Sequence, residues 1–323
     1  MSDIQKALIE LKAYISHEII GQDVLVERML IGLLADGHIL VEGAPGLAKT
    51  RAINVLSHGI EGDFHRVQFT PDLLPADLTG TEIYRPQQGT FEFQKGPLFH
   101  NLILADEINR SPAKVQSALL EAMAERQITV GQATYPLPEL FMVMATQNPI
   151  EQEGTYPLPE AQLDRFLLQV KVSYPNAAHE KTILRLVRTE ARKGTETSKK
   201  VFKPLTQLTL FAARNAVLNL HLSDALEDYL LQIILATRNP TVYGEDLAGW
   251  LQYGASPRAS IALDRCSRAK AWLAGRDYVA PEDIQDMAFD VLRHRLILSY
   301  EAEAEGMTTD DVIKVLLERI AVP

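Results

Sequence analysis

Residues 43–50 read Gly43-Ala44-Pro45-Gly46-Leu47-Ala48-Lys49-Thr50, and this stretch decides the fold. An apolar run at residues 39–41 precedes it, and a helical pattern with Ile53 and Leu56 follows it. A strand, a glycine loop and a helix in that order are typical of a phosphate-binding loop. The glycines let successive backbone N–H groups point into one concavity, and the helix N-terminus adds its positive dipole end. The alternative is an ordinary glycine turn.

Two side chains of this loop have predicted roles. Lys49 can reach the β- and γ-phosphates of a nucleotide, and the hydroxyl of Thr50 can bind Mg²⁺. The general loop pattern has glycine immediately before the lysine, whereas this chain has Ala48. From that methyl group we expect residue 48 to need no positive φ and to begin the helix.

A second motif, Leu-Ile-Leu-Ala-Asp-Glu at residues 102–107, predicts a buried parallel strand that ends in two acids. Ligands of open α/β sheets lie at the carboxyl ends of the strands. We therefore expect Asp106 to hold Mg²⁺, mostly through water, and Glu107 to polarise an attacking water. A solvated Asp-Glu turn is the alternative, but the two motifs in this order favour a phosphate-loop NTPase.

Three further residues are candidates for the same site, each with a plain structural alternative. Asn148 follows an apolar run at residues 141–146 and can orient a water beside the γ-phosphate, or it simply forms an Asn-Pro turn. Arg165 is an exposed helix-end arginine or a finger given to a neighbouring subunit's γ-phosphate. Pro257 at a first helical turn places Arg258 near a helix start, where it faces the nucleotide or solvent.

Taken together, GAPGLAKT, LADEINR, ATQNP, EAQLDRF and SPRAS, in this order, resemble the MoxR family of AAA+ ATPases. The resemblance covers nearly the whole chain, from residue 19 to the last helix, and the family pattern also has alanine before the lysine. It implies an α/β fold: an AAA+ phosphate-loop NTPase core, with a parallel sheet covered by helices, followed by a smaller all-α lid domain.

The resemblance also implies roles for particular residues. Ile20 and Gly21 match the element that flanks the adenine, and residues 43–50 surround the phosphates. The remaining roles are these: Lys49 and Thr50 for phosphate and Mg²⁺, Asp106 and Glu107 for metal and water, Asn148 as sensor 1, Arg165 as the finger acting in trans, and Arg258 as sensor 2. The cofactors implied are ATP and Mg²⁺.

The same resemblance implies a way of working. It indicates a homo-oligomer, a hexameric ring, that hydrolyses ATP and acts as a chaperone-like motor on partner proteins or metal-containing complexes. A protein with a von Willebrand factor A domain is the implied partner. Three alternatives stay open: the motor subunit of a metal chelatase, a DNA-directed AAA+ motor, and a nucleotide-dependent switch that hardly turns over. A DNA-directed motor would want a basic face or a Gly-Ala-Phe-Thr loop, and neither is found.

Patterning along the chain gives the domain boundaries. Residues 1–174 alternate strands with helices and carry two hairpin inserts, near 84–97 and 127–135; residues 175–323 are expected to be helical. Helices are expected at 4–15, after Asp23 as a possible N-cap, and near 204–219, 224–238, 257–274, 281–293 and 309–320. Asn176 is a predicted cap, and the polar stretch 191–200 is a predicted mobile loop.

Composition limits the remaining possibilities. The chain has 323 residues and a net charge of −10, so it is a poor non-specific ligand for nucleic acid. Its single cysteine, Cys266, excludes an internal disulfide framework and suits a reducing compartment. No apolar run approaches 18 residues and the N-terminus lacks a signal-peptide pattern, so we expect a cytoplasmic protein without membrane insertion.

Overall fold

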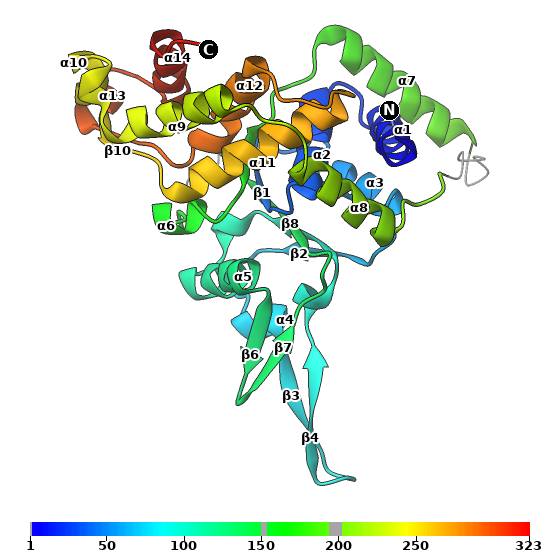
Figure 1. Ribbon diagram of the computed structural model, residues 1–323. Helices are drawn as coiled ribbons and strands as arrows, with labels where there is room; N and C mark the ends of the chain where they lie inside the picture. Colours follow the sequence, from blue (N-terminus) through cyan, green and yellow to red (C-terminus); the bar gives the residue numbers. More distant parts are fainter. Residues whose placement is uncertain (1, 150–153, 194–201) are drawn as a thin grey trace.

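A five-stranded parallel sheet organises the first half of the chain (Figure 1). The computed structural model describes residues 2–149, 154–193 and 202–323. Across the sheet the strands stand in the order β2 (Phe64–Gln68), β5 (Leu102–Asp106), β8 (Met142–Gln147), β1 (Ile39–Glu42) and β9 (Leu168–Lys171). Because every pair is parallel, all five carboxyl ends meet at one edge, where the phosphate loop and the two acids were predicted to lie.

Alternation along the buried strands divides the core between the two faces of this sheet. Ile39 and Val41 of β1 belong to one hydrophobic cluster, and Leu40 between them belongs to the other. The first cluster continues without a break into the helices of the second half of the chain. The helices of the first half, with a short 3-10 turn at each of Pro97–Phe99 and Ile108–Arg110, are α1 (Asp3–Glu18), α2 (Asp23–Leu34), α3 (Lys49–His58), α4 (Pro75–Thr79), α5 (Ala113–Glu125) and α6 (Glu160–Leu163).

Helix α1 was predicted by its periodicity, and Leu8, Leu11 and Ile15 are buried on one face of it as expected. The prediction for the start of α2 was wrong by one position. Gln22 is the N-cap and Asp23 is the first helical residue, with no side-chain cap. An acid in the first turn still favours the helix through its dipole, which explains why the sequence signal was present.

Two antiparallel hairpins project from the sheet, away from the helices of the second half of the chain (Figure 1). We call them the hairpin pair: β3 (Gly80–Arg85) with β4 (Thr90–Lys95), and β6 (Gln127–Val130) with β7 (Ala133–Pro136). Both turns fall where the sequence predicted them, with Gly89 and Gly131 at positive φ. The first hairpin begins earlier than residue 84, because Gly80 and Gly96 let its two strands approach too closely for any Cβ atom.

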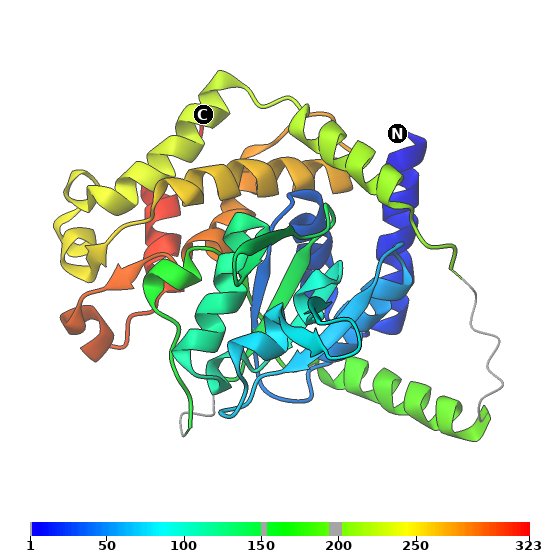
Figure 2. The same ribbon diagram turned by 90° about the horizontal axis from the view of Figure 1, so that it is seen from below.

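The second half of the chain is helical, as predicted. Helix α7 (Ala177–Lys193) lies along the outside of the molecule in both ribbon views (Figures 1 and 2) and is capped by Asn176, whose Oδ1 accepts from the His179 N–H at 2.9 Å. The remaining helices, with a 3-10 turn at Pro240–Val242, are α8 (Gln207–Leu218), α9 (Asp224–Arg238), α10 (Glu245–Trp250), α11 (Pro257–Leu273), α12 (Pro281–Leu292), α13 (Tyr300–Ala304) and α14 (Thr309–Arg319).

Two details of this half differ from the prediction or fall outside it. Strands β10 (Leu251–Tyr253) and β11 (Ile297–Leu298) form a small antiparallel pair that is too short to show a sequence period. Of the loop predicted at 191–200, the first three residues end α7 and the rest lie outside the described residues. Within the ranges that the structure describes, no helix is long and apolar enough to cross a membrane.

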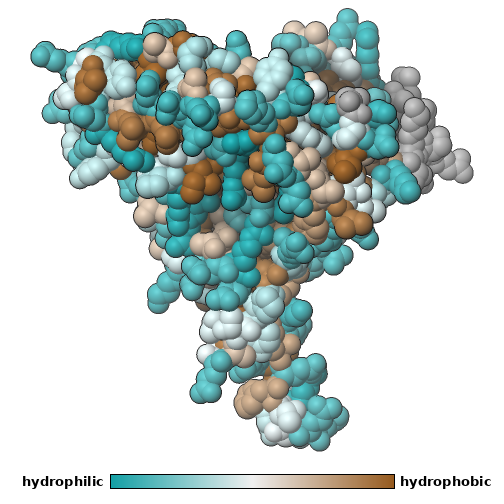
Figure 3. Space-filling view, viewed as in Figure 1, coloured by the Kyte–Doolittle hydropathy of each residue, from teal (hydrophilic) through white to brown (hydrophobic). Residues whose placement is uncertain are grey.

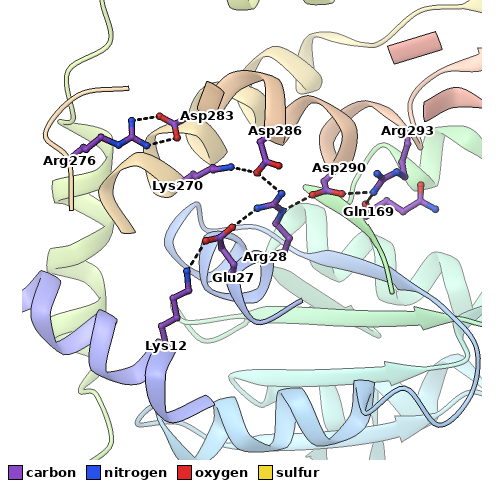
Figure 4. Close-up of polar contacts among 10 residues, drawn as sticks. All are labelled: Lys12, Glu27, Arg28, Gln169, Lys270, Arg276, Asp283, Asp286, Asp290 and Arg293. Carbon is purple, nitrogen blue, oxygen red and sulfur yellow. Dashed lines mark hydrogen bonds and ion pairs between the residues drawn. The ribbon is translucent and has the colours of Figure 1, made fainter. Parts of the chain in front are cut away.

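A set of charged side chains joins the helical second half to the sheet domain (Figure 4). Arg28 of α2 is its centre: its Nε donates to Asp290 and its Nη2 to Asp286, both at 2.6 Å, on α12. Lys270 of α11 also contacts Asp286, and Arg293 contacts Asp290 and the backbone oxygen of Gln169 on β9. We call these residues the junction cluster: Glu27, Arg28, Gln169, Lys270, Asp286, Asp290 and Arg293.

Candidate nucleotide site

The loop between β1 and α3 is shaped by two glycines that serve different purposes. Gly46 has φ +82° and faces open space, so its role is conformational freedom. Gly43 has an ordinary φ, but a Cβ there would lie 2.8 Å from the carbonyl oxygen of Val172, the residue after β9. The loop can therefore rest against the sheet edge only if residue 43 lacks a side chain.

Ala48 contradicts the expectation drawn from its methyl group. It adopts φ +59° and ψ +16°, in the left-handed region, and α3 begins one residue later at Lys49. The left-handed turn at residue 48 closes the loop before the helix, and an L-residue pays a steric penalty for it. A strained non-glycine residue held in place by its surroundings is a common feature of ligand-binding loops.

Lys49 turns back into the loop that it follows. Its Nζ donates to the carbonyl oxygen of Gly43 at 2.6 Å, and the side chain is partly buried. Burial lowers the pKa of Lys49, while the nearby carboxylates of Asp106, Glu107 and Glu42 act in the opposite direction. A partly desolvated ammonium beside a helix N-terminus is well suited to bind a phosphate.

Asp106 ends β5 and is held by two neighbouring side chains. Its Oδ1 accepts from the Thr146 hydroxyl at 2.6 Å, and its Oδ2 accepts from Nη2 of Arg66 at 2.8 Å and from Nε at 3.1 Å. Neither Thr146 nor Arg66 was picked out from the sequence. The carboxylate is buried and fixed in orientation, as a group that binds a metal through water needs to be.

Glu107 follows in the left-handed conformation, with φ +57°. Its carboxylate accepts from the amide nitrogen of Gln68 at 2.9 Å and pairs with Nε of Arg110 at 3.1 Å. Gln68 and Arg66 are two residues apart on β2, so they lie on one side of the strand that borders β5. That i, i+2 spacing was the available signal, but it has meaning only once the pairing of β2 with β5 is known.

One cavity of about 360 Å³ brings most of the predicted residues together. Its lining residues are Pro45, Gly46, Leu47, Ala48, Lys49, Thr50, Arg51, Asp106, Glu107 and Asn148. Asn148 thus lines the same space as the phosphate loop and both acids. Gly43 and Ala44, the first two residues of the loop, do not line this cavity.

Four predicted residues lie outside both the loop and the cavity. Ile20 and Gly21 come just before α2, where Gly21 has φ +78° and a Cβ would lie 2.8 Å from Nδ1 of His179. Arg165 donates to the carbonyl oxygen of Leu120 at 2.5 Å. Arg258 is exposed, and its Nη1 lies 3.8 Å from the Asp164 carboxylate. The arginines are therefore outside the cavity of their own chain.

The donor set of the cavity fits a magnesium triphosphate. The helix N-terminus and Lys49 suit the anion, and Thr50 and Asp106 offer hard oxygen ligands. Among the described residues, no three His, Cys, Asp or Glu side chains cluster as a metal site. A cation here would thus share its ligands with phosphate oxygens and water, which Mg²⁺ commonly does.

The fold and this cavity define a phosphate-loop nucleotide site on a parallel sheet, followed by a helical lid. Residues 38–168 match the model of the AAA family, described as ATPases associated with various cellular activities, and residues 249–316 match the AAA lid domain.

Similar proteins narrow the assignment. The chain is 46% identical to Chaperone MoxR1 of Mycobacterium tuberculosis, over 99% of this chain and 82% of that protein. It is 32% identical to Protein MoxR of Paracoccus denitrificans, over 95% of this chain and 94% of that protein. A crystal structure from Cytophaga hutchinsonii superposes with a TM-score of 0.90 at 46% identity, covering 99% of this chain and 96% of the other. The chain belongs to the MoxR family of AAA+ ATPases.

Proposed function

We propose that this protein binds ATP with Mg²⁺ and hydrolyses it to ADP and phosphate. The observation that carries the proposal is that the phosphate loop, Asp106, Glu107 and Asn148 line one common cavity. Mg²⁺ would neutralise charge on the phosphates. Lys49 would exchange its bond to the Gly43 carbonyl for a phosphate oxygen, and Thr50 and Asp106 would hold the cation.

Glu107 and Asn148 are assigned to the attacking water. The carboxylate of Glu107 accepts a proton from the water, and the Asn148 amide orients it toward the γ-phosphate. In the structure Gln68 and Arg110 engage Glu107, so the carboxylate exchanges those partners for the water before it can act. Ile20 and Gly21 are assigned to the adenine, and Arg258 to sensing the phosphates.

Arg165 is assigned to a neighbouring subunit's nucleotide, because it lies outside its own cavity. A head-to-tail contact that closes on itself gives a ring, which we propose is a homohexamer. Within each subunit, residues 1–174 form the nucleotide-binding core and 175–323 the lid.

We further propose a cytoplasmic, chaperone-like role in which hydrolysis remodels or matures a partner protein or a metal-containing complex. The name of the M. tuberculosis relative, a chaperone, supports this role. A von Willebrand factor A domain protein is the proposed partner. A metal-chelatase motor subunit is the second candidate and would require a dedicated chelatase partner; a low-turnover switch is the third.

Mixing of two inactive variants tests the proposal. Glu107→Gln should retain ATP but lose turnover by at least ~10². Arg165→Ala should also bind ATP and lose about 10³–10⁵ in rate. When the two are mixed, an interface can pair an intact Glu107 with an intact Arg165, so partial activity should return. No recovery in demonstrated mixed oligomers would contradict action in trans.

Lys49→Ala controls for the site itself. It removes the main protein cation from the triphosphate and should weaken ATP binding by about 2–5 kcal/mol in calorimetric titration. Unchanged affinity would contradict the assignment of residues 43–50. Glu107→Gln that hydrolyses ATP at the parental rate would show that another group activates the water.

A further inference from the structure

The segment that carries Arg165 is held by a buried arginine, Arg295, from the turn that follows α12. The side chain of Arg295 is 2% exposed, and its Nη2 donates to the carbonyl oxygen of Phe166 at 2.6 Å. Its Nη1 donates to the carbonyl oxygen of Leu167 at 3.2 Å, and its Nε donates to the carboxylate of Asp164 at 2.8 Å. One guanidinium thus binds both sides of Arg165.

A second donor from the same turn supports this arrangement. Nε2 of His294 is 3.1 Å from the Phe166 carbonyl oxygen, and the ring is buried. Burial lowers the pKa of His294 well below its ordinary value, so the ring is neutral and donates through Nε2. Phe166 itself is fully buried, which fixes the chain immediately after Arg165.

The carboxylate of Asp164 connects this clamp to the other candidate arginine. Its Oδ2 accepts from the hydroxyl of Ser256 at 2.8 Å, and Nη1 of Arg258 lies 3.8 Å from the same oxygen. Ser256 is the N-cap of α11, so Asp164 holds the helix start on which Arg258 lies. Arg258 thus lies near the carboxylate that Arg295 fixes, and Arg165 is the next residue in the chain after Asp164.

We propose that Arg295 is a positioning residue for ATP hydrolysis: from the turn after α12 it holds residues 164–167 and so fixes the position of Arg165. This rests on the proposed action of Arg165 in trans. Arg295 touches no nucleotide, and its effect is exerted on the site of the neighbouring subunit. A subunit with a defective Arg295 keeps a complete phosphate loop and both acids, and fails only as the donor of the finger.

Arg295→Lys tests this, because lysine keeps the charge but lacks the planar fork in which three separate nitrogens reach the carboxylate and the two carbonyl oxygens. Turnover should fall about 10–100-fold, as expected when a catalytic group is displaced by about 1 Å, while KM for ATP stays within about twofold. Mixing with Glu107→Gln should restore activity, since those subunits supply an intact finger. Mixing with Arg165→Ala should not, since neither partner then supplies one.

Two further variants separate positioning from folding. Asp164→Asn is nearly isosteric and should show the same pattern of rescue with a smaller loss. Arg293→Lys, in the same turn, alters a buried arginine whose hydrogen bonds go to Gln169, Asp290 and Asp310 instead of residues 164–167; its folded fraction should turn over normally. Any loss from Arg293→Lys should not be rescued selectively by Glu107→Gln.

The outcomes distinguish this inference from the proposed function. Recovery in the Arg165→Ala and Glu107→Gln mixture, together with no selective rescue of Arg295→Lys and Asp164→Asn, overturns the positioning role alone. Parental turnover in Arg295→Lys does the same. Failure of the Arg165→Ala mixture to recover overturns action in trans, and the positioning role falls with it.

Discussion

The junction cluster and the hairpin pair hold their parts of the molecule by opposite means. The cluster buries charge: the side chains of Arg28 and Asp290 are 5% and 8% exposed. In the hairpin pair, by contrast, the ion pair of Arg85 with Glu92 joins side chains that are 53% and 62% exposed. Buried charges need their own partners, whereas water readily replaces an exposed pair. The lid is therefore fixed on the core by specific contacts that the hairpins lack.

Aromatic rings, not charges, join the two hairpins. Phe93 of β4 stacks on Tyr135 of β7 with ring centroids 4.1 Å apart, and Phe99 meets both rings edge-on. Farther out, Tyr84 and Phe91 form an exposed pair. The space-filling view shows the hairpin pair as a narrow projection with a small hydrophobic patch near its far end (Figure 3). Changes there should leave the core and the nucleotide site folded.

The largest effect should come from removing the centre of the junction cluster. Arg28→Ala leaves Asp286 and Asp290 without their shared cation, and removing one partner of a buried ion pair costs about 3–5 kcal/mol. Urea unfolding followed by circular dichroism measures the free energy of unfolding. A loss below about 1 kcal/mol would mean that Lys270 and Arg293 alone satisfy these carboxylates. The contacts of Arg28 would then stabilise the protein no more than an exposed surface ion pair does.

The contacts of the junction cluster could not be predicted from the sequence. Arg28 and Asp290 are 262 residues apart, so no local period or spacing connects them. By contrast, the sequence predicted that the phosphate loop, Asp106, Glu107 and Asn148 lie close together. Each follows a short apolar strand, and parallel strands share one carboxyl edge. The hairpin turns could be predicted equally well, because a glycine marks each of them in the local sequence.

Backbone conformation at the site was less predictable. The rule that an L-residue avoids positive φ led to a wrong expectation for Ala48, and it gave no warning for Glu107. Both residues end a strand or loop at the sheet edge, where neighbouring contacts outweigh local preference. Partners such as Arg66 and Gln68 were missed because strand register, which the sequence does not state, decides which side chains meet.

Acid should weaken the sheet domain through His38, while leaving the hairpin contacts intact. Nδ1 of His38 accepts from the Val143 N–H at 3.0 Å, and burial lowers the pKa of the ring from 6.5 to about 4. The unfolded chain therefore binds more protons below pH 6.5, so stability is present above that pH and falls by about 3 kcal/mol as pH drops to 4. Urea unfolding between pH 4 and 7 measures the slope.

A matched variant identifies the source of that slope. His38→Gln removes the titrating group, so its free energy of unfolding should change less between pH 6.5 and 4 than that of the parent. An undiminished slope would assign the effect to other groups, including His294, whose pKa burial also lowers.

Truncating the stacked ring should have an intermediate effect. Phe93→Ala removes contacts with Tyr135 and Phe99, and aromatic pairs contribute about 0.5–1.5 kcal/mol each, so we expect a loss of about 1–3 kcal/mol. The loss should be confined to the hairpin pair, which hydrogen exchange can localise. Faster exchange in α2 or α12 as well would mean that the hairpin pair and the junction cluster are energetically coupled, and that they are not held independently.

The smallest effect is expected at the exposed ion pair of the hairpin. Arg85 Nε and Glu92 Oε2 are 2.7 Å apart, but both side chains are mostly exposed, so their coupling in a double-mutant cycle should be below about 1 kcal/mol and should shrink with added salt. Arg276 and Asp283 provide the matched pair on the lid. There two bonds of 2.6 Å reach a carboxylate whose side chain is 2% exposed, and charged hydrogen bonds of this kind contribute about 1.5–3 kcal/mol. Equal coupling energies in the two cycles would show that burial does not set the strength of these contacts, and the contrast between the two regions would then have to rest on packing alone.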